Sequence, residues 1–591
     1  MATSTPSPVP GGEPVGARSR SPRVLLSLAA VAVAFAAADT YVVVLALPDM
    51  MTSAGLDLDQ LQRAAPIVSG FLLGYVGVLP LIGRIADLRG RAPVLLASLV
   101  VFAIGSVLTA VAYDLDTMVV GRFVQGVGGG GLVPATLALV ADLWPPERRG
   151  LPLGVVGAVQ ELGSVVGPLY GAVVLAVADW RAIFWLNCAV GLVLVAALLA
   201  VRPDERAGPA RSRGRPDVVG GLLVVLALAG VAVLELEPAR LVTDITWGLA
   251  FIPVVGETRW ASPLAIGVLA VVALFVLRQA TARRPLLDWR SWGPVVRTTD
   301  LLGALLLAVA LGAVVIAFAS ADPEQSALSP QAPWLLGVAA LAAVGFAWRQ
   351  RTATHPLVPR DALRARRAWG SIVVSFLVGS ALIAALVDIP FFARITVHRD
   401  SQLDAALVLL RFLVALPIGA VIGGWLTRRV RPAPLTAVAM LAVAVSFVVM
   451  AGWDRDALLS WTSSVPLVVA GLGFGVAIAP VNAALLASTA REAHGVASAL
   501  LVVARMVGML VGISALTTIG LQRFYVATRQ IPPVAELCPG GTTCAAYRDA
   551  LVDAGVVQLS TVFTGAAVCA AAAAVLALVL LRPGRADTAD A

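Results

Sequence analysis

Long apolar stretches alternate with short polar or charged connections along almost the whole chain. A helix that crosses about 30 Å of hydrocarbon needs about 20 apolar residues, and stretches of roughly this length recur sixteen times. The pattern predicts an all-α membrane protein with about sixteen spans, or fourteen as the alternative. The predicted spans are 24–48, 64–83, 92–113, 117–141, 151–177, 182–201, 217–236, 262–278, 299–319, 333–349, 368–392, 403–429, 433–452, 464–488, 496–519 and 562–582.

The positions of the charges test this number, because short cytoplasmic loops of membrane proteins collect basic residues. All 43 basic residues are arginine. They cluster in alternate connections such as "GRIADLRGRAP" and "RQRTATHPLVPRDALRARR", whereas "SADPEQSALSPQAP" has none. An even number of spans with both termini in the cytoplasm preserves this bias. The sequence therefore predicts a multi-pass protein of a bacterial plasma membrane.

The composition agrees with this interpretation. Hydrophobic residues make up 59% of the 591 residues and charged residues only 13%, against about 25% in soluble proteins. The net charge of +8 fits a cytoplasmic face that lies against anionic membrane lipids, and we do not expect nucleic-acid binding.

Two internal repeats divide the chain. The segment 217–287 is similar to 299–358, most clearly in "RQATARRPLL" against "RQRTATHPLV", which predicts a duplicated helical hairpin. Six spans precede this insert and six follow it, as in transporters built from repeats. The predicted divisions are a disordered tail at 1–22, a six-helix bundle at 23–201, a linker with two hairpins at 202–367, a second bundle at 368–582 with an outer loop at 520–561, and a tail at 583–591.

The connection after the second span carries a specific motif. It reads "GRIADLRGR", and the corresponding connection of the second half reads "GGWLTRRVR", which lacks the acidic residue. The first copy resembles the signature of the major facilitator superfamily between its second and third spans. The resemblance implies two six-helix bundles and a charge latch that biases the inward/outward equilibrium. The latch would consist of Gly83, Arg84, Asp87, Arg89, Gly90 and Arg91.

Further segments resemble one branch of that family. "GRFVQGVGGGG" is similar to its fourth-span motif, with Arg122 and Gln125 at the polar positions, and "QELGSVVGPLYG" to the antiporter motif around Gly167 and Pro168. "DWRAIFWLN" resembles the sixth span of drug:proton antiporters with fourteen spans. Within this branch, "ADTYVVV", "QELGSVVGPLYG", "FLVALPIGAVIGGW" and "ASALLVVARMVGMLVG" together resemble actinobacterial triacylglycerol exporters that work with a periplasmic lipid-carrying lipoprotein. The chain departs from them by its additional hairpin and by Arg411, where we expect an uncharged residue.

Ionisable residues inside the spans are the candidates for function, because a charge at the bilayer centre is costly unless it faces a cavity or a partner. The strongest are Asp39, Glu161 and Arg505. We expect Asp39 to pair with Arg505 in one state and to be protonated in another, which would couple protons to export; a purely structural ion pair is the alternative. Asp388 and Arg411 lie near the outer ends of their spans and are expected to reach the interface.

The four cysteines follow the topology. Cys188 and Cys569 lie inside spans and are interpreted as small apolar residues. Cys538 and Cys544 lie in the predicted outer loop, where an oxidising environment permits a disulfide, with two free thiols as the alternative.

These sequence features distinguish three classes of function. A transporter of apolar or amphipathic molecules is favoured. An enzyme is not expected, since the only histidines, His355, His398 and His494, are not clustered, and no cofactor or metal is predicted. A receptor or scaffold that has lost transport is the remote alternative. The sequence leaves the substrate open between lipid and drug.

Overall fold

The computed structural model describes residues 22–56, 61–201, 217–254, 259–282, 295, 298–319, 331–398, 402–538 and 544–582, and its regular structure there is helical. Sixteen of the helices have 19 residues or more, and each corresponds to one predicted span. Thirteen of the described helical stretches are long and apolar enough to cross a membrane. The predicted tails at 1–22 and 583–591 lie almost wholly outside the described residues.

The first six long helices form one bundle. Aromatic and aliphatic side chains fill its interior, among them Phe71, Phe102 and Leu132, which are almost fully buried. Side-chain caps fix some of the helix starts: Asp114, for example, accepts a hydrogen bond of 2.8 Å from the backbone N–H of Thr117. The helices are α1 (Pro22–Ser53), α2 (Leu61–Arg89), α3 (Arg91–Ala110), α4 (Leu115–Leu143), α5 (Gly150–Val177) and α6 (Arg181–Val201).

The last six long helices form a second bundle with the same neighbour relations. The pairs α1–α5, α2–α4 and α3–α6 of the first bundle correspond to α13–α17, α14–α16 and α15–α19 of the second. The two bundles meet where α2 packs on α17 and where α5 packs on α14. The helices are α13 (Arg366–Ile395), α14 (Gln402–Leu426), α15 (Pro432–Ala451), α16 (Ser464–Ala487), α17 (His494–Thr528), α18 (Val534–Leu537) and α19 (Ala545–Leu580).

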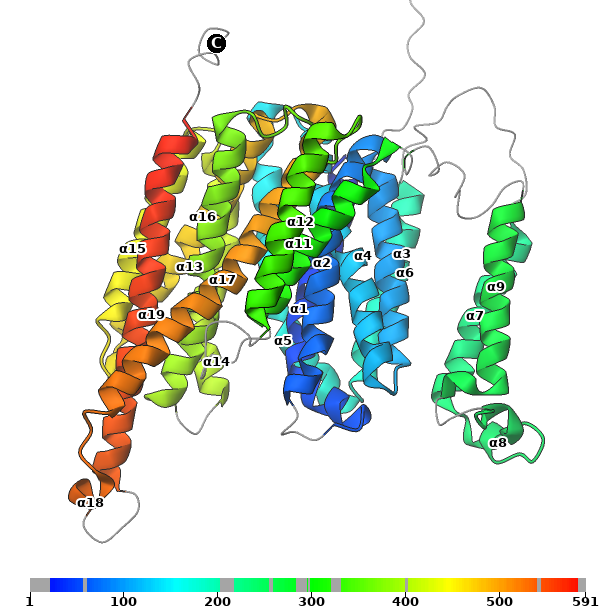
Figure 1. The fold of residues 1–591 in the computed structure, drawn as a ribbon, viewed down its shortest axis with the longest axis horizontal. Helices are drawn as coiled ribbons and strands as arrows, with labels where there is room; N and C mark the ends of the chain where they lie inside the picture. The colour runs from blue at the N-terminus through cyan, green and yellow to red at the C-terminus, as the bar shows by residue number, and fades with distance from the viewer. Residues whose placement is uncertain are drawn as a thin grey trace, which may run out of the picture.

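Two hairpins connect the bundles. They consist of α7 (Val218–Leu236) with α9 (Pro263–Thr281), joined through the short α8 (Ala239–Val242), and of α11 (Leu301–Ala319) with α12 (Ala332–Thr352). Helix α11 packs against α2 and α17, whereas α7 and α9 stand at the edge of the molecule (Figure 1).

The hairpins share one polar clasp, which supports the predicted duplication. In the first, Asp217 caps α7 through the N–H of Gly220 and pairs with Arg278 at 3.1 Å. In the second, Asp300 caps α11 and pairs with Arg349 at 2.9 Å. Both acids precede the first helix of a hairpin, and both arginines lie in the last turn of the second helix. The clasp therefore closes the two ends of each hairpin in the same way.

The predicted outer loop 520–561 is wrong for most of its length. Helix α17 continues to Thr528 and α19 begins at Ala545, so that the connection is short and contains α18. At 35 residues α17 is about 52 Å long, well beyond about 30 Å of hydrocarbon. In Figure 1 the lower ends of α17 and α19 project past the other helices of the bundle. Charges such as Arg523 and Arg548 end the apolar run but do not end the helices.

Candidate functional site

Asp39 lies at the centre of a buried polar network in the first bundle. Its side chain is fully buried and accepts hydrogen bonds from Arg122 Nη1 at 2.7 Å and from Gln125 Nε2 at 3.0 Å. A third donor is the side-chain amide of Asn187. Arg122 is also fully buried, and its guanidinium stacks 4.4 Å from the centre of the Phe71 ring. This carboxylate is therefore both charge-paired and hydrogen-bonded, as a buried charge requires.

The network joins all six helices of the first bundle. Gln125 of α4 also donates to Ser106 of α3, and Tyr170 of α5 donates to Asn187 of α6. Asp39 lies on α1, and Phe71 lies on α2. Arg122 and Gln125 had been selected as motif residues, but sequence reasoning missed Asn187, Ser106 and Tyr170. The signal for Asn187 was the single amide in the apolar run "FWLNCAVGLVLV".

The predicted partner of Asp39 is wrong in this structure. Asp39 pairs with Arg122, and Arg505 instead pairs with Glu161, with 3.7 Å between Nη1 and Oε1. The expectation that opposite charges meet across the two halves holds for this second pair, because Glu161 lies on α5 and Arg505 on α17. Each is the eleventh residue after the first residue of its helix, Gly150 or His494, or about 16 Å along it. Equivalent helices thus supply opposite charges at the same depth.

A cavity between the bundles lies beside this pair. Its polar lining residues are Gln160, Ser375, Asn482 and Arg505, and the rest of the lining is aliphatic, from α4, α5, α13, α16 and α17. The volume open to water-sized molecules is about 30 Å³, which is room for one or two waters. A lipid could enter only after the two bundles move apart.

The predicted latch residues connect the two bundles at one end of the molecule, here called the latch end. The carboxylate of Asp87 accepts the backbone N–H groups of Gly495 at 2.8 Å and Val496 at 3.0 Å. These residues begin α17, where N–H groups lack partners within the helix and favour a negative charge. The acid of one bundle therefore caps a helix of the other.

Arginines add further contacts at the latch end. Arg91 bonds to Asp87 and to the carbonyl oxygen of Arg491, at 3.2 and 2.9 Å, and it pairs with Asp142 at 3.1 Å. Arg84 donates to the carbonyl oxygen of Glu492 at 3.3 Å. Of the remaining latch residues, Arg89 is the last residue of α2.

Two glycines make this approach possible. A Cβ atom on Gly83 would lie 2.6 Å from the carbonyl oxygen of Gly495, so a larger residue would separate α2 from α17. Gly90 has φ of 96°, a conformation that favours glycine, and it forms the turn between α2 and α3. The sequence motif is thus explained by the contact that it makes.

The antiporter-like motif lies on α5 against α1. A Cβ on Gly167 would lie 2.5 Å from the carbonyl oxygen of Ala38, the residue before Asp39. The motif therefore brings α5 close to the buried network. The side chain of Pro168 lies outside the described part of the structure.

The two outer candidates behave differently. Arg411 is exposed and donates to Ser464, the first residue of α16, at 2.8 Å. That it reaches the membrane interface stays a prediction. Asp388 is buried: its side chain faces the interior of the second bundle and only 5% of the residue is exposed. The same expectation for Asp388 was wrong because Asp388 lies on the face of α13 that carries the buried residues Ala384, Ala385 and Ile389.

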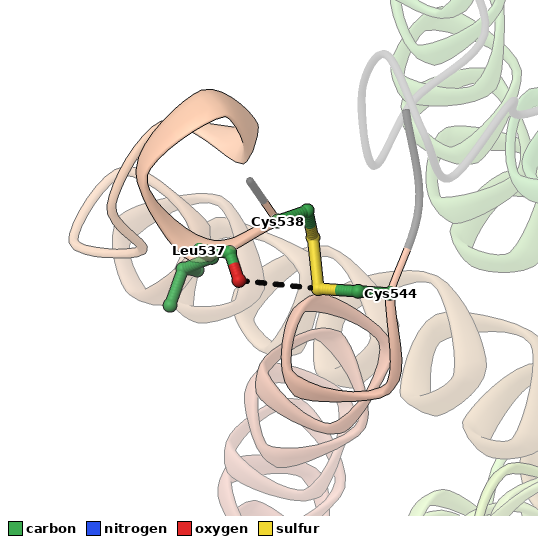
Figure 2. Close-up of a disulfide and its surroundings, with 3 residues drawn as sticks. All are labelled: Leu537, Cys538 and Cys544. Atoms are coloured by element: carbon green, nitrogen blue, oxygen red, sulfur yellow. Dashed lines mark hydrogen bonds between the residues drawn. A yellow bond between two sulfur atoms is a disulfide. The ribbon is translucent and has the colours of Figure 1, made fainter. Parts of the chain in front are cut away.

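The predicted disulfide between Cys538 and Cys544 is present. It closes the connection between α18 and α19, and the sulfur of Cys544 lies 3.4 Å from the carbonyl oxygen of Leu537 (Figure 2). Cys188 and Cys569 are free. Among the described residues, no group of His, Cys, Asp and Glu could hold a metal ion.

Known proteins with similar sequences and folds place the chain in a family. The model of the Major Facilitator Superfamily matches residues 29–354 and 301–513. The triacylglyceride transporter of Mycolicibacterium hassiacum is 35% identical, over 97% of this chain and 94% of the relative, and that of Mycobacterium tuberculosis H37Rv is 34% identical, over 96% of each. The human organic anion transporter MFSD10 has the same fold, with a TM-score of 0.53 at 14% identity over 95% of this chain and 99% of that one. The chain belongs to the Major Facilitator Superfamily.

Proposed function

We propose that this transporter exports triacylglycerides, or lipids of similar apolarity, across the plasma membrane of a bacterium and that protons drive the export. The observation that carries the substrate class is the near full-length similarity to proteins named triacylglyceride transporters. The largely aliphatic lining of the cavity between the bundles supports it. An uncharged, apolar lipid gains no binding free energy from a charged side chain such as that of Arg505. We therefore assign the charged residues beside the cavity to the conformational change rather than to recognition of the lipid.

The latch and the Glu161–Arg505 pair hold the bundles together in the present state. Both link the first bundle to α17, the latch at the beginning of the helix and the pair about three turns further along it. Export requires these contacts to separate, so that the cavity widens toward the latch end and accepts lipid. The structure thus represents a state closed at the latch end, which we assign to the cytoplasmic side because that end carries the arginine-rich connections.

Asp39 is the proposed proton acceptor. A proton on its carboxylate removes the charge that balances Arg122, and the bonds from Arg122, Gln125 and Asn187 must then rearrange. Since these residues lie on two other helices, α4 and α6, the change reaches the packing of the first bundle. The carboxylate would release its proton when the network re-forms, and alternation between the two forms couples proton entry to export.

The projecting ends of α17 and α19 are proposed to guide lipid away from the outer surface. They form a rim that is closed by the disulfide and lies beyond the membrane. A periplasmic lipid-carrying lipoprotein is the partner that we propose to receive the lipid there. Drug efflux is the second candidate, favoured by the motif around Gly167, which resembles drug:proton antiporters.

One experiment separates these functions. Everted membrane vesicles that contain the protein are given a labelled triacylglyceride. The amount of lipid that accumulates in the vesicles is measured with and without an imposed proton gradient. Drug susceptibility is measured in cells that produce the same protein. We expect gradient-dependent lipid accumulation and unchanged drug susceptibility. Lipid movement that ignores the gradient would remove the proton coupling, and drug resistance without lipid movement would replace the substrate.

A further inference from the structure

A second cavity lies at the latch end, within the second bundle and apart from the cavity between the bundles. Its volume is about 400 Å³. Arg366 and Arg367 at the beginning of α13 and Arg582 after the end of α19 line it, together with Ser488 and Thr489 after the end of α16 and two alanines. Residues at the ends of three helices of one bundle therefore line a single space, and three of them are arginines.

Two of the three arginines that line this cavity lack a counter-charge within the described part of the chain. No acidic residue is among those that line it. Arg366 and Arg582 are exposed, and neither has an ion-pair or hydrogen-bond partner among the described residues. Guanidinium groups repel one another, and they bind phosphate oxygens through paired N–H donors. An anion with several oxygens would satisfy this arrangement.

The depth of the cavity indicates the source of such an anion. The apolar stretch of α13 begins at Arg366, and that of α19 ends at Leu580, so the arginines lie where hydrocarbon gives way to headgroups. Trp369, one turn into α13, is 42% exposed, and tryptophan is enriched at this level of a bilayer. Basic pockets between spanning helices at the cytoplasmic side are suited to anionic lipid headgroups.

We propose that this cavity binds the phosphate group of an anionic phospholipid. The bound headgroup bridges α13 and α19 and contacts the connection that follows α16. Two residues after Thr489, the same connection makes the latch contacts of Arg491 and Glu492. Occupancy therefore holds together the part of the second bundle on which the latch closes.

The test compares two charge-matched variants of the full chain. Arg366→Gln with Arg582→Gln removes two charges from the cavity. Arg364→Gln with Arg428→Gln removes two exposed arginines that do not line the cavity, of which Arg364 pairs with Asp361 on the surface. Purified, delipidated proteins are titrated with phosphatidylglycerol, with phosphatidylcholine and with inorganic phosphate, and bound lipid and Tm are measured by native mass spectrometry and thermal unfolding.

We expect the unchanged chain to prefer phosphatidylglycerol over phosphatidylcholine and to gain Tm as it binds. The cavity variant should bind phosphatidylglycerol roughly thirtyfold more weakly, and the surface variant should behave like the unchanged chain. Equal binding by the cavity variant, or equal loss in the surface variant, overturns the proposal. Inorganic phosphate that raises Tm where the lipid does not would identify a free anion instead. If the double variant does not fold, each single variant is tested in the same titration.

Discussion

Asp39 and Arg122 form a buried ion pair to which we have assigned two roles, stabilisation of the fold and the proposed acceptance of a proton. Removal of one partner from such a pair is strongly destabilising because the other charge remains buried, whereas neutral replacement of both is tolerated far better. The pair stands inside one bundle, with hydrogen bonds to Gln125 and Asn187. Its structural and functional roles can therefore be separated by mutation.

The first prediction uses this asymmetry. Asp39→Asn should lower the free energy of unfolding by about 3–5 kcal/mol, because Arg122 loses its counter-charge. Asp39→Asn with Arg122→Gln should recover most of that loss, since two amides can still hydrogen-bond with Gln125. Thermal unfolding in detergent and gradient-driven lipid export are measured for both. The double variant should be folded and inactive; a double variant that exports with the normal pH dependence would leave Asp39 as a structural charge only.

The sequence was sufficient to select these ionisable residues but not to pair them. Each is conspicuous because it interrupts an apolar run, and this signal does not depend on the fold. The partner depends on how each helix is rotated and on which helices are neighbours. Asp39 and Arg505 have opposite charges, but α1 packs on α4 and α5 of its own bundle, which brings Asp39 to Arg122.

At the level of helices, the latch has an uncharged counterpart in the second half. Aligned with "GRIADLRGR", the segment "GGWLTRRVR" places Thr427 where the first copy has Asp87. Thr427 lies close to Gly150, the first residue of α5: a Cβ atom added to Gly150 would clash with the hydroxyl oxygen of Thr427. Asp87 occupies the same position against the beginning of α17. The two contacts are equivalent, but only one carries a charge.

The second prediction concerns a variant without the carboxylate of Asp87. Asp87→Asn should impair export with little loss of protein, because an amide accepts the N–H groups of Gly495 and Val496 less well than a carboxylate does. Export in vesicles and the amount of protein in the membrane are measured together. Arg364→Gln, an exposed change near the same end, serves as the control. Normal export by Asp87→Asn would show that the latch does not tune the equilibrium.

The third prediction concerns a variant that has a carboxylate at position 427, the counterpart of Asp87 in the second half. Thr427→Asp places a carboxylate near the beginning of α5, where it should favour the closed latch end by about 1 kcal/mol, or about fivefold in the ratio of closed to open states. Spin labels on α2 and α14 at the latch end report the distance distribution. The closed population should increase and export should slow. Thr427→Asn is the uncharged control, and an identical effect of both changes would rule out the electrostatic explanation.

The helix ends were less predictable than the helices. The apolar pattern located all sixteen long helices, because burial in lipid selects for long apolar stretches. It missed the projecting ends of α17 and α19, where a helix outside the hydrocarbon no longer needs apolar residues on every side. The disulfide was predictable from two cysteines in one outer connection, but the sequence did not show that it closes the tip of a helical hairpin.

At the scale of the whole molecule, the Glu161–Arg505 ion pair connects the first bundle to the second. The fourth prediction exchanges its charges: Glu161→Gln and Arg505→Gln should each reduce export, and Glu161→Arg with Arg505→Glu should restore a substantial part of it. The reason is that the pair crosses between equivalent helices at equal depth. Vesicle export is measured for all three variants at equal protein levels. Failure of the exchange, in a folded protein, would mean that each residue has a separate role.

The two hairpins allow a test of architecture, because each can be deleted without reversing the orientation of the helices that follow. Helix α11 contacts α2 and α17, and Val315 is part of the core of the first bundle. The α7–α9 hairpin contributes Val231 and Val268 to a small cluster with Val111 near the end of α3. Among the described residues, the hairpin meets the first bundle at this small cluster, whereas α11 packs against both α2 and α17.

The last prediction follows from that difference. Deletion of 217–282 should leave the export rate within about twofold of that of the full chain. The reason is that the lost packing at the edge of the molecule should lower the free energy of unfolding by only about 1 kcal/mol, and the two bundles keep their own contacts. Deletion of 299–352 removes the clasp of Asp300 and Arg349 and bares α2 and α17, and it should abolish export. Both shortened chains are compared for membrane insertion, thermal unfolding and lipid export. If the first deletion is folded but inactive, the additional hairpin takes part in transport, and the duplication has produced a working element rather than a peripheral one.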